Sequence, residues 1–345
     1  MKYLVLSGKD GSSLDLCSKV EAYLKERGID YTAESDFLVG KEEPAVVIAV
    51  GDDGLILSTF RKLGRMQVPV LGISTGTSVL SEADAENYKS VIDSIQKGEF
   101  SIQKRTRIVA IFGRSESGSE GNKGDGKETV FALNEIGVFP GRSAEILRYT
   151  LGIDGKYSFK DNADGVIVST PTGSTGYAMS CGGPMVIDEP EILTITPVSS
   201  MSKSYSPLVV SNGSRIRISG MHAKSGVCAV IDGTERVTID ADSVEIVRSE
   251  FPALFVKPKF SQSIVEKLRK RTFAVDHDLM RSMPASAKLI YKTLAYEGEM
   301  TQKEIISETY LPSRTARYAL ELLLKRNMVS KKPNLNDVRQ TVYSV

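Results

Sequence analysis

The stretch DGVIVSTPTGSTGYAMSCGGP, which spans residues 164–184, joins an apolar run to a loop rich in glycine, serine and threonine. The run at 165–169 predicts a β-strand. In the loop that follows, backbone N–H groups are free, and the side chains are small enough for a phosphate or a ribose to approach. Taken alone, these residues predict a turn beside a ligand, and an ordinary polar connection is an equally good alternative.

The first domain, residues 1–100, alternates between predicted strands and helices. Apolar runs, among them 45–50 and 69–73, predict buried strands, and residues at helical spacing lie between them. These two strands lead directly into Gly51-Asp52-Asp53-Gly54 and into residues 74–78. Strands that alternate with helices form a mostly parallel sheet, whose ligands bind at the carboxyl ends of the strands. We therefore expect an α/β domain with its ligands at these two loops.

Residues 101–256 have a different pattern. Seven short β-rich runs lie between residues 105 and 247, and no long helical pattern interrupts them. Repeated short strands of this kind predict a second domain that is β-rich and sandwich-like. The predicted fold class is therefore an α/β domain followed by a β-rich domain.

The charge of the chain changes sign near residue 257. The formal net charge is only +1, but residues 257–345 hold 17 Lys and Arg against 9 Asp and Glu, which leaves 27 against 34 for residues 1–256. An acidic body and a basic tail predict two parts with different partners. Within the tail, residues 257–278 are predicted to be a basic linker.

Residues 279–345 predict a small α+β domain of the winged helix-turn-helix type. Three helical patterns are followed by two extended segments that flank Lys331 and Lys332. In such a domain the second helix of the turn motif enters the DNA major groove, so Arg314 and Arg317 near its start are candidate DNA contacts, as are the two lysines at the wing. The alternative is a module for dimerisation or docking, whose charges are merely solvated.

The N-terminus predicts neither a signal sequence nor a membrane span, because the first apolar run has four residues before Ser7. The three cysteines are widely spaced and odd in number, which argues against a disulfide framework and favours a reducing compartment. We therefore expect a cytoplasmic protein with no membrane partner. The two histidines lie far apart and outside any motif, so we predict no metal centre held by the chain and no Ser-His-Asp chemistry.

The stretch at 164–184 resembles the signature loop of the NAD kinase family. Three further segments are similar to motifs of that family and occur in the family's order. Gly51-Asp52-Asp53-Gly54 stands where the family has GGDG, residues 72–76 resemble its GINxG segment, and Asn134-Glu135 follow a strand as its NE motif does. On these motifs, residues 1–255 are identified as a member of the family.

The resemblance implies transfer of the γ-phosphoryl group of ATP, or of a polyphosphate, to the 2′-hydroxyl of the adenosine ribose of NAD. It implies Mg²⁺ or another divalent cation as cofactor, and a homo-oligomer that is a dimer or a tetramer. A ribose hydroxyl is a poor nucleophile and needs a group that accepts its proton. Asp53 matches the family's aspartate near that hydroxyl and is the candidate catalytic base. The positions that match the family's NAD- and ATP-binding residues are Gly51, Gly54, Asn134, Glu135, Asp164, Thr175, Gly176, Tyr177 and Ser180.

Two residues depart from the family's motifs and leave alternatives open. Asp52 replaces a glycine and places a second carboxylate beside a predicted phosphate site, where it either binds a metal or repels the phosphates. Ser74 replaces an asparagine. One alternative to the kinase is therefore a transcription regulator, in which a degenerate kinase body senses NAD or NADP and the tail binds DNA. A third possible function is that of a lipid or sugar kinase with a similar loop. Asp53 also has a structural alternative, because aspartate is a common helix N-cap and could simply cap the helix that starts at Gly54.

Overall fold

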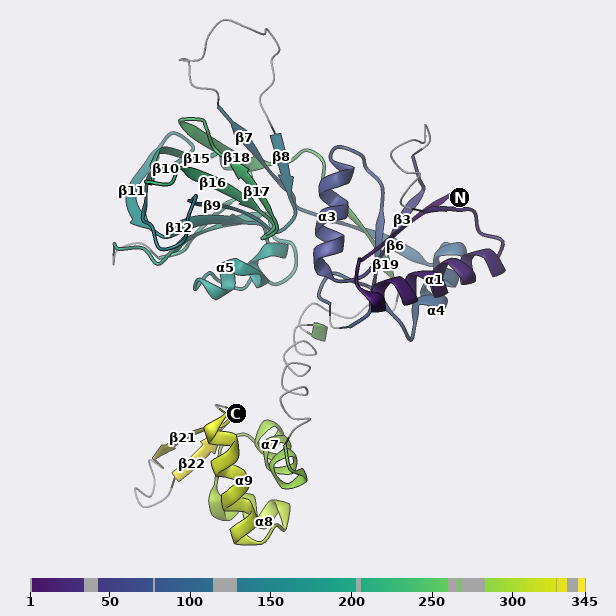
Figure 1. Cartoon of the computed structure of the whole chain (residues 1–345), viewed down its shortest axis with the longest axis vertical. Helices are drawn as coiled ribbons and strands as arrows, with labels where there is room; N and C mark the ends of the chain where they lie inside the picture. The colour runs from purple at the N-terminus through teal and green to yellow at the C-terminus, as the bar shows by residue number, and fades with distance from the viewer. Residues whose placement is uncertain are drawn as a thin grey trace, which may run out of the picture. The chain divides into compact units, whose positions relative to one another are not determined.

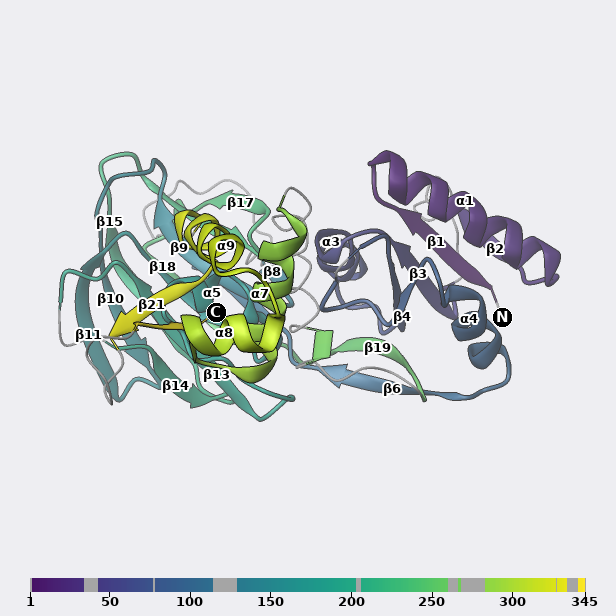
Figure 2. The same ribbon diagram turned by 90° about the horizontal axis from the view of Figure 1, so that it is seen from below.

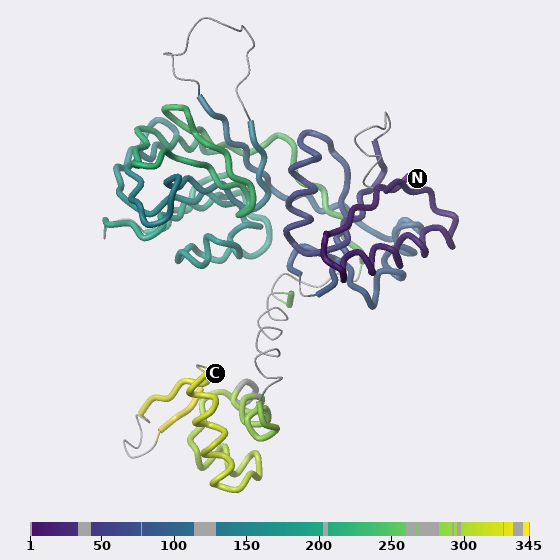
Figure 3. Tube along the Cα trace, viewed as in Figure 1, coloured from purple at the N-terminus to yellow at the C-terminus, as the bar shows by residue number. Residues whose placement is uncertain are grey.

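The computed structural model describes residues 2–33, 43–76, 78–113, 129–202, 206–259, 266–267, 283–326, 328–333 and 341–344. The chain divides into two compact units, Met1–Leu268 and Arg269–Val345. Figure 3 follows the chain from the N-terminus in the first unit to the C-terminus in the second.

The first unit contains a seven-stranded, mostly parallel sheet (Figure 1). Its strands are β1 (Tyr3–Ser7), β2 (Tyr31–Ala33), β3 (Val46–Val50), β4 (Val70–Ser74), β5 (Ala83–Asp84), β6 (Phe100–Arg105) and β19 (Ala253–Pro258). They are ordered β2-β1-β3-β4-β19-β6, and β5 also pairs with β4. β6 runs antiparallel to β19, and every other strand pair in this sheet is parallel.

Helices cover both faces of this sheet, as Figures 1 and 2 show. α1 (Gly11–Glu26) and α4 (Tyr88–Gln96) pack on one face, and α3 (Asp53–Leu63) packs on the other. The strand sequences explain this arrangement, because successive side chains point to opposite faces of a sheet. In β3, Ile48 joins the core under α1 and α4, whereas Val47 and Ala49 join the core under α3. This arrangement confirms the predicted α/β class.

Two antiparallel sheets pack face to face in the rest of the first unit (Figure 1). One consists, in spatial order, of β11 (Tyr157–Ala163), β10 (Leu147–Ile153), β15 (Ile216–His222), β18 (Ser243–Arg248), β7 (Ile108–Phe112) and β8 (Thr129–Ala132). The other consists of β14 (Leu208–Ser211), β13 (Ile192–Val198), β12 (Gly165–Ser169), β9 (Glu135–Pro140), β16 (Val227–Ile231) and β17 (Glu235–Thr238). Alternate residues turn inward, so Leu147 and Leu151 of β10 share a core with Ile195 of β13. The sandwich confirms the predicted β-rich domain.

Strands β6 and β19 differ from the predicted division at residues 100 and 256. Both belong to the α/β sheet and pair with each other from Ala253–Arg105 to Pro258–Phe100. The chain therefore leaves the first sheet through β6, builds the sandwich, and returns through β19. The predicted boundaries cut these strands because a local pattern of apolar residues does not indicate which sheet a strand joins.

Within its described residues, the second unit consists of the helices α7 (Ala285–Glu297), α8 (Gln302–Thr309) and α9 (Ser313–Lys325) and the strands β20 (Met300–Thr301), β21 (Ser330–Pro333) and β22 (Thr341–Ser344). The strands are ordered β20-β22-β21. Ile290, Ile305 and Leu320 bring the three helices into one core. Thr301 and Glu304 form the capping box that their spacing predicts. Most of the predicted linker lies outside the described residues. None of the helices in the described ranges combines the length and apolar content that crossing a membrane requires.

Candidate active site

The carboxyl ends of three neighbouring strands bring the glycine-rich loops of the first sheet together. β1, β3 and β4 are adjacent, and their hydrogen bonds continue past the strand ends. The Gly8 N–H donates to the Val50 carbonyl at 2.9 Å, and the Gly51 N–H donates to the Ile73 carbonyl at 2.9 Å. A Cβ added at Gly51 would lie 3.0 Å from the Leu55 side chain. The GDDG loop is therefore closely packed at the edge where open α/β sheets bind ligands.

Asp52, the residue that departs from GGDG, is the N-cap of α3. Its backbone is extended, and its carboxylate accepts a hydrogen bond from the Leu55 N–H at 2.9 Å. Aspartate is among the best N-cap residues, and the helix dipole favours a negative charge at this end. The additional carboxylate is thus used by the helix, and the capping role considered for Asp53 belongs to Asp52.

The carboxylate of Asp53 is held by the segment that follows β4. One oxygen accepts hydrogen bonds from the Ser78 hydroxyl and, at 3.1 Å, from the Leu80 N–H. The other oxygen accepts from the Val79 N–H at 3.2 Å. The Ser78 hydroxyl in turn accepts the Ser81 N–H at 2.8 Å. Asp53 is half-buried, and these donors fix the orientation of its carboxylate at the start of α3.

The Asn134-Glu135 pair and the loop after β12 form the second part of the site. β9 pairs with β12, which places Glu135 beside the end of β12. The Thr170 N–H donates to the Asn134 carbonyl at 2.9 Å. A Cβ added at Gly173 would lie 2.1 Å from that carbonyl oxygen, so only glycine fits there. A Cβ added at Gly176 would lie 3.0 Å from a Glu135 carboxylate oxygen. The two motifs are therefore in direct contact.

Glu135 is a buried carboxyl group whose pKa is raised. It is 5% exposed, and burial, with the neighbouring Asp232 charge as the second cause, raises its pKa to about 8. Within the described part of the chain, one Glu135 carboxyl oxygen and the Asn134 side-chain oxygen are buried without a hydrogen-bond partner. Buried polar atoms are nearly always paired in folded proteins. These two oxygens therefore indicate a place for the hydroxyl or amino groups of a ligand.

Asp232 supports this site, and the sequence motifs did not reveal it. Its carboxylate accepts the N–H groups of three consecutive residues, Leu133, Asn134 and Glu135, at 3.0, 2.7 and 3.3 Å. Its second oxygen lies 3.1 Å from the Nη1 of Arg61, which is on α3. Asp232 thus fixes the turn before β9 and connects it to the helix of the GDDG loop. The available signal was an Asp-Gly pair directly after a predicted strand, which is typical of a tight turn.

Of the remaining predicted residues, Thr175 ends the 3-10 helix η1 (Thr172–Thr175), and Gly176 is the N-cap of α5 (Tyr177–Ser180), which contains Tyr177 and Ser180. Asp164 directly precedes β12. Thr175 is buried, whereas Tyr177 and Ser180 are exposed. The Tyr177 ring centre lies 6.1 Å from that of Phe139. Burial raises the pKa of the Tyr177 hydroxyl, and neighbouring groups that include Asp164 raise it further. Asp164 and Tyr177 are therefore close enough to interact, although β12 and its loop separate them in sequence.

The predicted nucleic-acid contacts lie in the second unit. Arg314 and Arg317 are exposed on α9, whose apolar side packs into the core of that unit. Lys331 and Lys332 are exposed on β21, and Lys332 forms an ion pair with Glu299. The four basic side chains are accessible to a partner.

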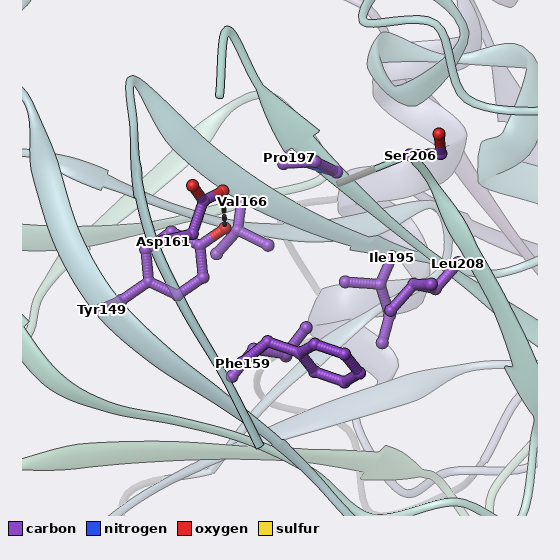
Figure 4. Close-up of a pocket in the computed structure, with 9 residues that line it drawn as sticks. Tyr149, Phe159, Asp161, Val166, Ile195, Pro197, Ser206 and Leu208 are labelled. Atoms are coloured by element: carbon purple, nitrogen blue, oxygen red, sulfur yellow. Dashed lines mark hydrogen bonds between the residues drawn. The ribbon is translucent and has the colours of Figure 1, made fainter. Parts of the chain in front are cut away.

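A separate pocket opens between the two sheets of the sandwich (Figure 4). Its lining is almost entirely apolar, and the Tyr149 hydroxyl within it donates a hydrogen bond to Asp161 at 3.2 Å. The lining residues are Tyr149, Leu151, Phe159, Asp161, Val166, Ile195, Pro197, Ser206 and Leu208. The predicted NAD- and ATP-binding residues are not among them, so this pocket is distinct from the site around Asn134 and Asp53.

Two family models match the first unit. Residues 39–100 match the ATP-NAD kinase N-terminal domain, and residues 133–258 match the ATP-NAD kinase C-terminal domain. The NAD kinase of Methanothermobacter thermautotrophicus is 31% identical to the chain over 275 residues, which cover 75% of this chain and 91% of that protein. The chain belongs to the NAD kinase family. The resemblance that the four motifs indicated is thereby confirmed.

Solved structures of NAD kinases have the same fold as this family member. The crystal structure of an NAD kinase from Archaeoglobus fulgidus in complex with ATP matches with a TM-score of 0.62 and 28% identity, and covers 78% of this chain and 99% of that chain. Yeast NADH kinase complexed with NADH shares the fold, with a TM-score of 0.65 and 22% identity over 75% of this chain and 83% of that chain. The family models end at residue 258, so assignment to the NAD kinase family rests on the first unit.

Proposed function

We propose that this member of the NAD kinase family transfers the γ-phosphoryl group of ATP to the 2′-hydroxyl of the adenosine ribose of NAD and so forms NADP. One observation carries the proposal: α3 begins at Asp53 and, through Arg61 and Asp232, is connected to the turn that holds Asn134 and Glu135. Phosphoryl transfer depends on positioning more than on covalent chemistry, so a base and a nucleotide-binding turn on one rigid support suit it. Family membership favours this function over a regulator or a lipid or sugar kinase.

Asp53 is the proposed general base. A carboxylate offers about four acceptor positions, and the donors from Ser78, Val79 and Leu80 use three of them. The remaining position accepts the proton of the ribose hydroxyl when that oxygen attacks the phosphoryl group. Gly51 and Gly54 flank the two aspartates, where small residues let the phosphates approach the backbone.

The adenosine half of NAD is proposed to bind at the turn before β9. The unpaired Asn134 oxygen accepts a hydrogen bond from the nucleoside, and protonated Glu135 both donates and accepts. Tyr177 offers an exposed ring face to the nucleotide. The other residues proposed to line the nucleotide are Asp164, Thr175, Gly176 and Ser180.

The proposed cofactor is Mg²⁺ or another divalent cation, which neutralises phosphate charge in this chemistry when it is bound. Mg²⁺ is usually held by one or two carboxylates together with substrate phosphates. Asp52 fits this requirement, because it is exposed and only one of its carboxylate oxygens is used in capping α3. It is therefore the residue of the GDDG loop that we expect to hold the cation.

The decisive assay supplies the purified full chain with NAD, Mg²⁺ and either ATP or polyphosphate, and measures NADP with an NADP-specific dehydrogenase. Binding of NAD without formation of NADP would contradict the proposed function, and phosphorylation of a lipid or sugar instead would support the third alternative. Asp53→Asn should lower kcat by about 100-fold or more with little change in NAD affinity, because general bases contribute that much. An Asp53→Asn variant with normal turnover would exclude Asp53 as the base.

Asp52→Asn is the matched variant, because asparagine caps a helix about as well as aspartate. We expect it to keep turnover at saturating Mg²⁺ and to need more Mg²⁺ for half-maximal rate. An unchanged Mg²⁺ requirement would show that Asp52 does not hold the cation.

We propose in addition that the second unit contacts DNA through α9 and β21. The exposed Arg314, Arg317, Lys331 and Lys332 support this proposal, as does the excess of Lys and Arg after residue 257. Replacing Arg314 and Arg317 by alanine should weaken the affinity of the full chain for duplex DNA by about 10-fold at low salt, and reduce its salt dependence. Lys303→Ala is the control, because Lys303 is an exposed basic residue of α8. Absence of binding at low salt would leave docking or dimerisation as the role of this unit.

We also propose that the protein is a homo-oligomer, a dimer or a tetramer, and that it works in the cytoplasm. The resemblance to NAD kinases supports the first proposal. The odd number and wide spacing of Cys17, Cys181 and Cys228 support the second, because disulfide frameworks are rare in reducing compartments. Sedimentation of the purified chain and fractionation of the source cells test them.

A further inference from the structure

A buried lysine at the end of the first unit holds the segment that carries the donors to Asp53. Lys267 is 8% exposed, and its ammonium group donates to the Ser81 carbonyl and to the Glu82 carboxylate, both at 2.7 Å. The Glu82 side chain is 1% exposed. Burial lowers the pKa of the Lys267 ammonium group, and the Glu82 charge opposes that change. A complete charge pair is therefore withdrawn from water at this point.

This pair differs from the ion pairs on the surface of the same unit. The Lys19–Asp15 pair, for example, has side chains 60% and 67% exposed, and such pairs contribute little. In a buried pair, the attraction between the two charges has to offset their loss of hydration. Such a pair is therefore weak evidence that the folded state is stabilised. Since the second Glu82 oxygen is buried without a partner among the described residues, hydration is not fully replaced. The Lys267–Glu82 pair is therefore better suited to fixing the local conformation of the backbone than to adding stability.

The residues that Lys267 contacts end the segment 78–82, whose beginning holds the catalytic carboxylate. The Ser81 N–H donates to the Ser78 hydroxyl, and that hydroxyl donates to Asp53. The Glu82 N–H donates to the Gly72 carbonyl of β4 at 3.1 Å. Lys267 and β4 thus hold the C-terminal end of the segment 78–82, and Asp53 is hydrogen-bonded to its N-terminal end.

Arg105 adds a second buried cation near the same segment. It is 5% exposed, and burial lowers its pKa, whereas the charges of Glu189, Glu82 and Asp53 raise it. Its guanidinium lies 4.3 Å from the ring centre of Phe255 on β19. Glu82 therefore interacts with two cations, Lys267 and Arg105, and Arg105 also interacts electrostatically with Asp53.

We propose that Lys267 is a positioning residue for phosphoryl transfer, because it fixes residues 78–82 and through them the orientation of the Asp53 carboxylate. Its effect on turnover rests on the proposed function, whereas the anchoring of the segment does not. The second unit begins at Arg269, so the anchor also lies on the covalent path between the two units.

Hydrogen exchange of the full chain tests the anchoring directly. In Lys267→Met, the amides of residues 78–82 should exchange at least about 10-fold faster than in the wild type, because local opening no longer breaks the lysine's two bonds. The amides of β3 should keep their wild-type rates. Lys267→Arg retains donors to a carbonyl and a carboxylate and should restore slow exchange. Lys19→Met is the control and should match the wild type.

Steady-state kinetics on the same variants test the positioning. Lys267→Met should lower kcat by about 10- to 100-fold, since small displacements of a catalytic group have effects of that size. The KM for NAD should stay within about two-fold, because a group that acts in the transition state changes kcat rather than ground-state binding. Lys267→Arg should recover most of kcat, and Lys19→Met should leave kcat unchanged.

Unchanged exchange at 78–82, or equal acceleration there and in β3, would overturn the inference, as would a normal kcat with accelerated exchange. If Lys267→Met does not fold, the double variant Lys267→Met with Glu82→Gln leaves no unpaired buried charge and is expected to give the same result. A wild type that forms no NADP contradicts the proposed function, and the exchange measurement then still decides whether Lys267 is the anchor.

Discussion

Replacing Asp232 by alanine should destabilise the first unit and weaken NAD binding together. The Asp232 side chain is 0% exposed, and its carboxylate accepts three backbone N–H groups and the guanidinium of Arg61. After the substitution these donors stay in an interior that lacks their acceptor. The backbone that presents Asn134 and Glu135 also loses the group that holds it.

The magnitude follows from the number and burial of the partners. Breaking a buried ion pair by removing one member costs about 3–5 kcal/mol, and each buried donor left unpaired costs about 1–3 kcal/mol. Arg61 keeps a second partner, because its Nε lies 3.1 Å from Glu235. We therefore expect a loss of about 4 kcal/mol. In a unit of this size 1 kcal/mol shifts Tm by about 2–4 °C, so Tm should fall by about 8–16 °C.

Scanning calorimetry measures the Tm of the first unit, and titration calorimetry measures its affinity for NAD. Glu235→Ala is the matched control, because Glu235 pairs with the same arginine but its side chain is 51% exposed. Exposed pairs contribute about 0–1 kcal/mol, so this variant should keep both properties. An Asp232→Ala variant whose Tm lies within about 2 °C of the wild type would refute the reasoning, since that corresponds to less than about 1 kcal/mol.

Two further predictions concern the nucleotide site. Gly173→Ala places a Cβ 2.1 Å from the Asn134 carbonyl oxygen, so we expect NAD binding to be lost and stability to fall by about 2 kcal/mol or more; wild-type affinity in titration calorimetry would show that the loop relaxes at no cost. Glu135 has a pKa of about 8 in the folded chain against 4.5 as its ordinary value, so its contribution to stability is complete below about pH 4.5 and is lost as the pH rises through 8. The Tm of Glu135→Gln should therefore fall less than that of the wild type over this range, and equal slopes would contradict the burial of a proton at Glu135.

The parts of the fold that depend on near neighbours were predictable from the sequence. An apolar run at 45–50 followed by GDDG predicts a strand, a loop and a helix, because each is determined by periodicity and turn residues within a few positions. Thr301 and Glu304 predict their capping box for the same reason. The NAD kinase motifs predicted the family, although their packing against each other, such as Gly173 against Asn134, becomes visible only in three dimensions.

Contacts between distant segments were not predictable by such rules. Asp232 bonds to Leu133, and Lys267 bonds to Ser81, across long separations in the chain, and nothing in the local pattern of either residue identifies its partner. β19 presents the same difficulty, because its apolar pattern suits either sheet of the first unit. Asp232 and Lys267 are buried, as are Glu82 and Arg105, and which ionisable residues are buried is a property of the fold.

The two adjacent carboxylates of the GDDG loop have different surroundings, which explains how the departure from GGDG is accommodated. Asp53 is fixed from the side by residues 78–80, whereas Asp52 caps α3 and remains exposed. Glycine caps a helix nearly as well as aspartate, so the backbone of the loop needs no adjustment when one replaces the other. What changes is the charge at the N-terminus of α3, where the helix dipole attracts the carboxylate and phosphates alike. The substitution therefore alters the electrostatics of the donor side and leaves the geometry of Asp53 intact, which makes the requirement for a divalent cation the property most sensitive to Asp52.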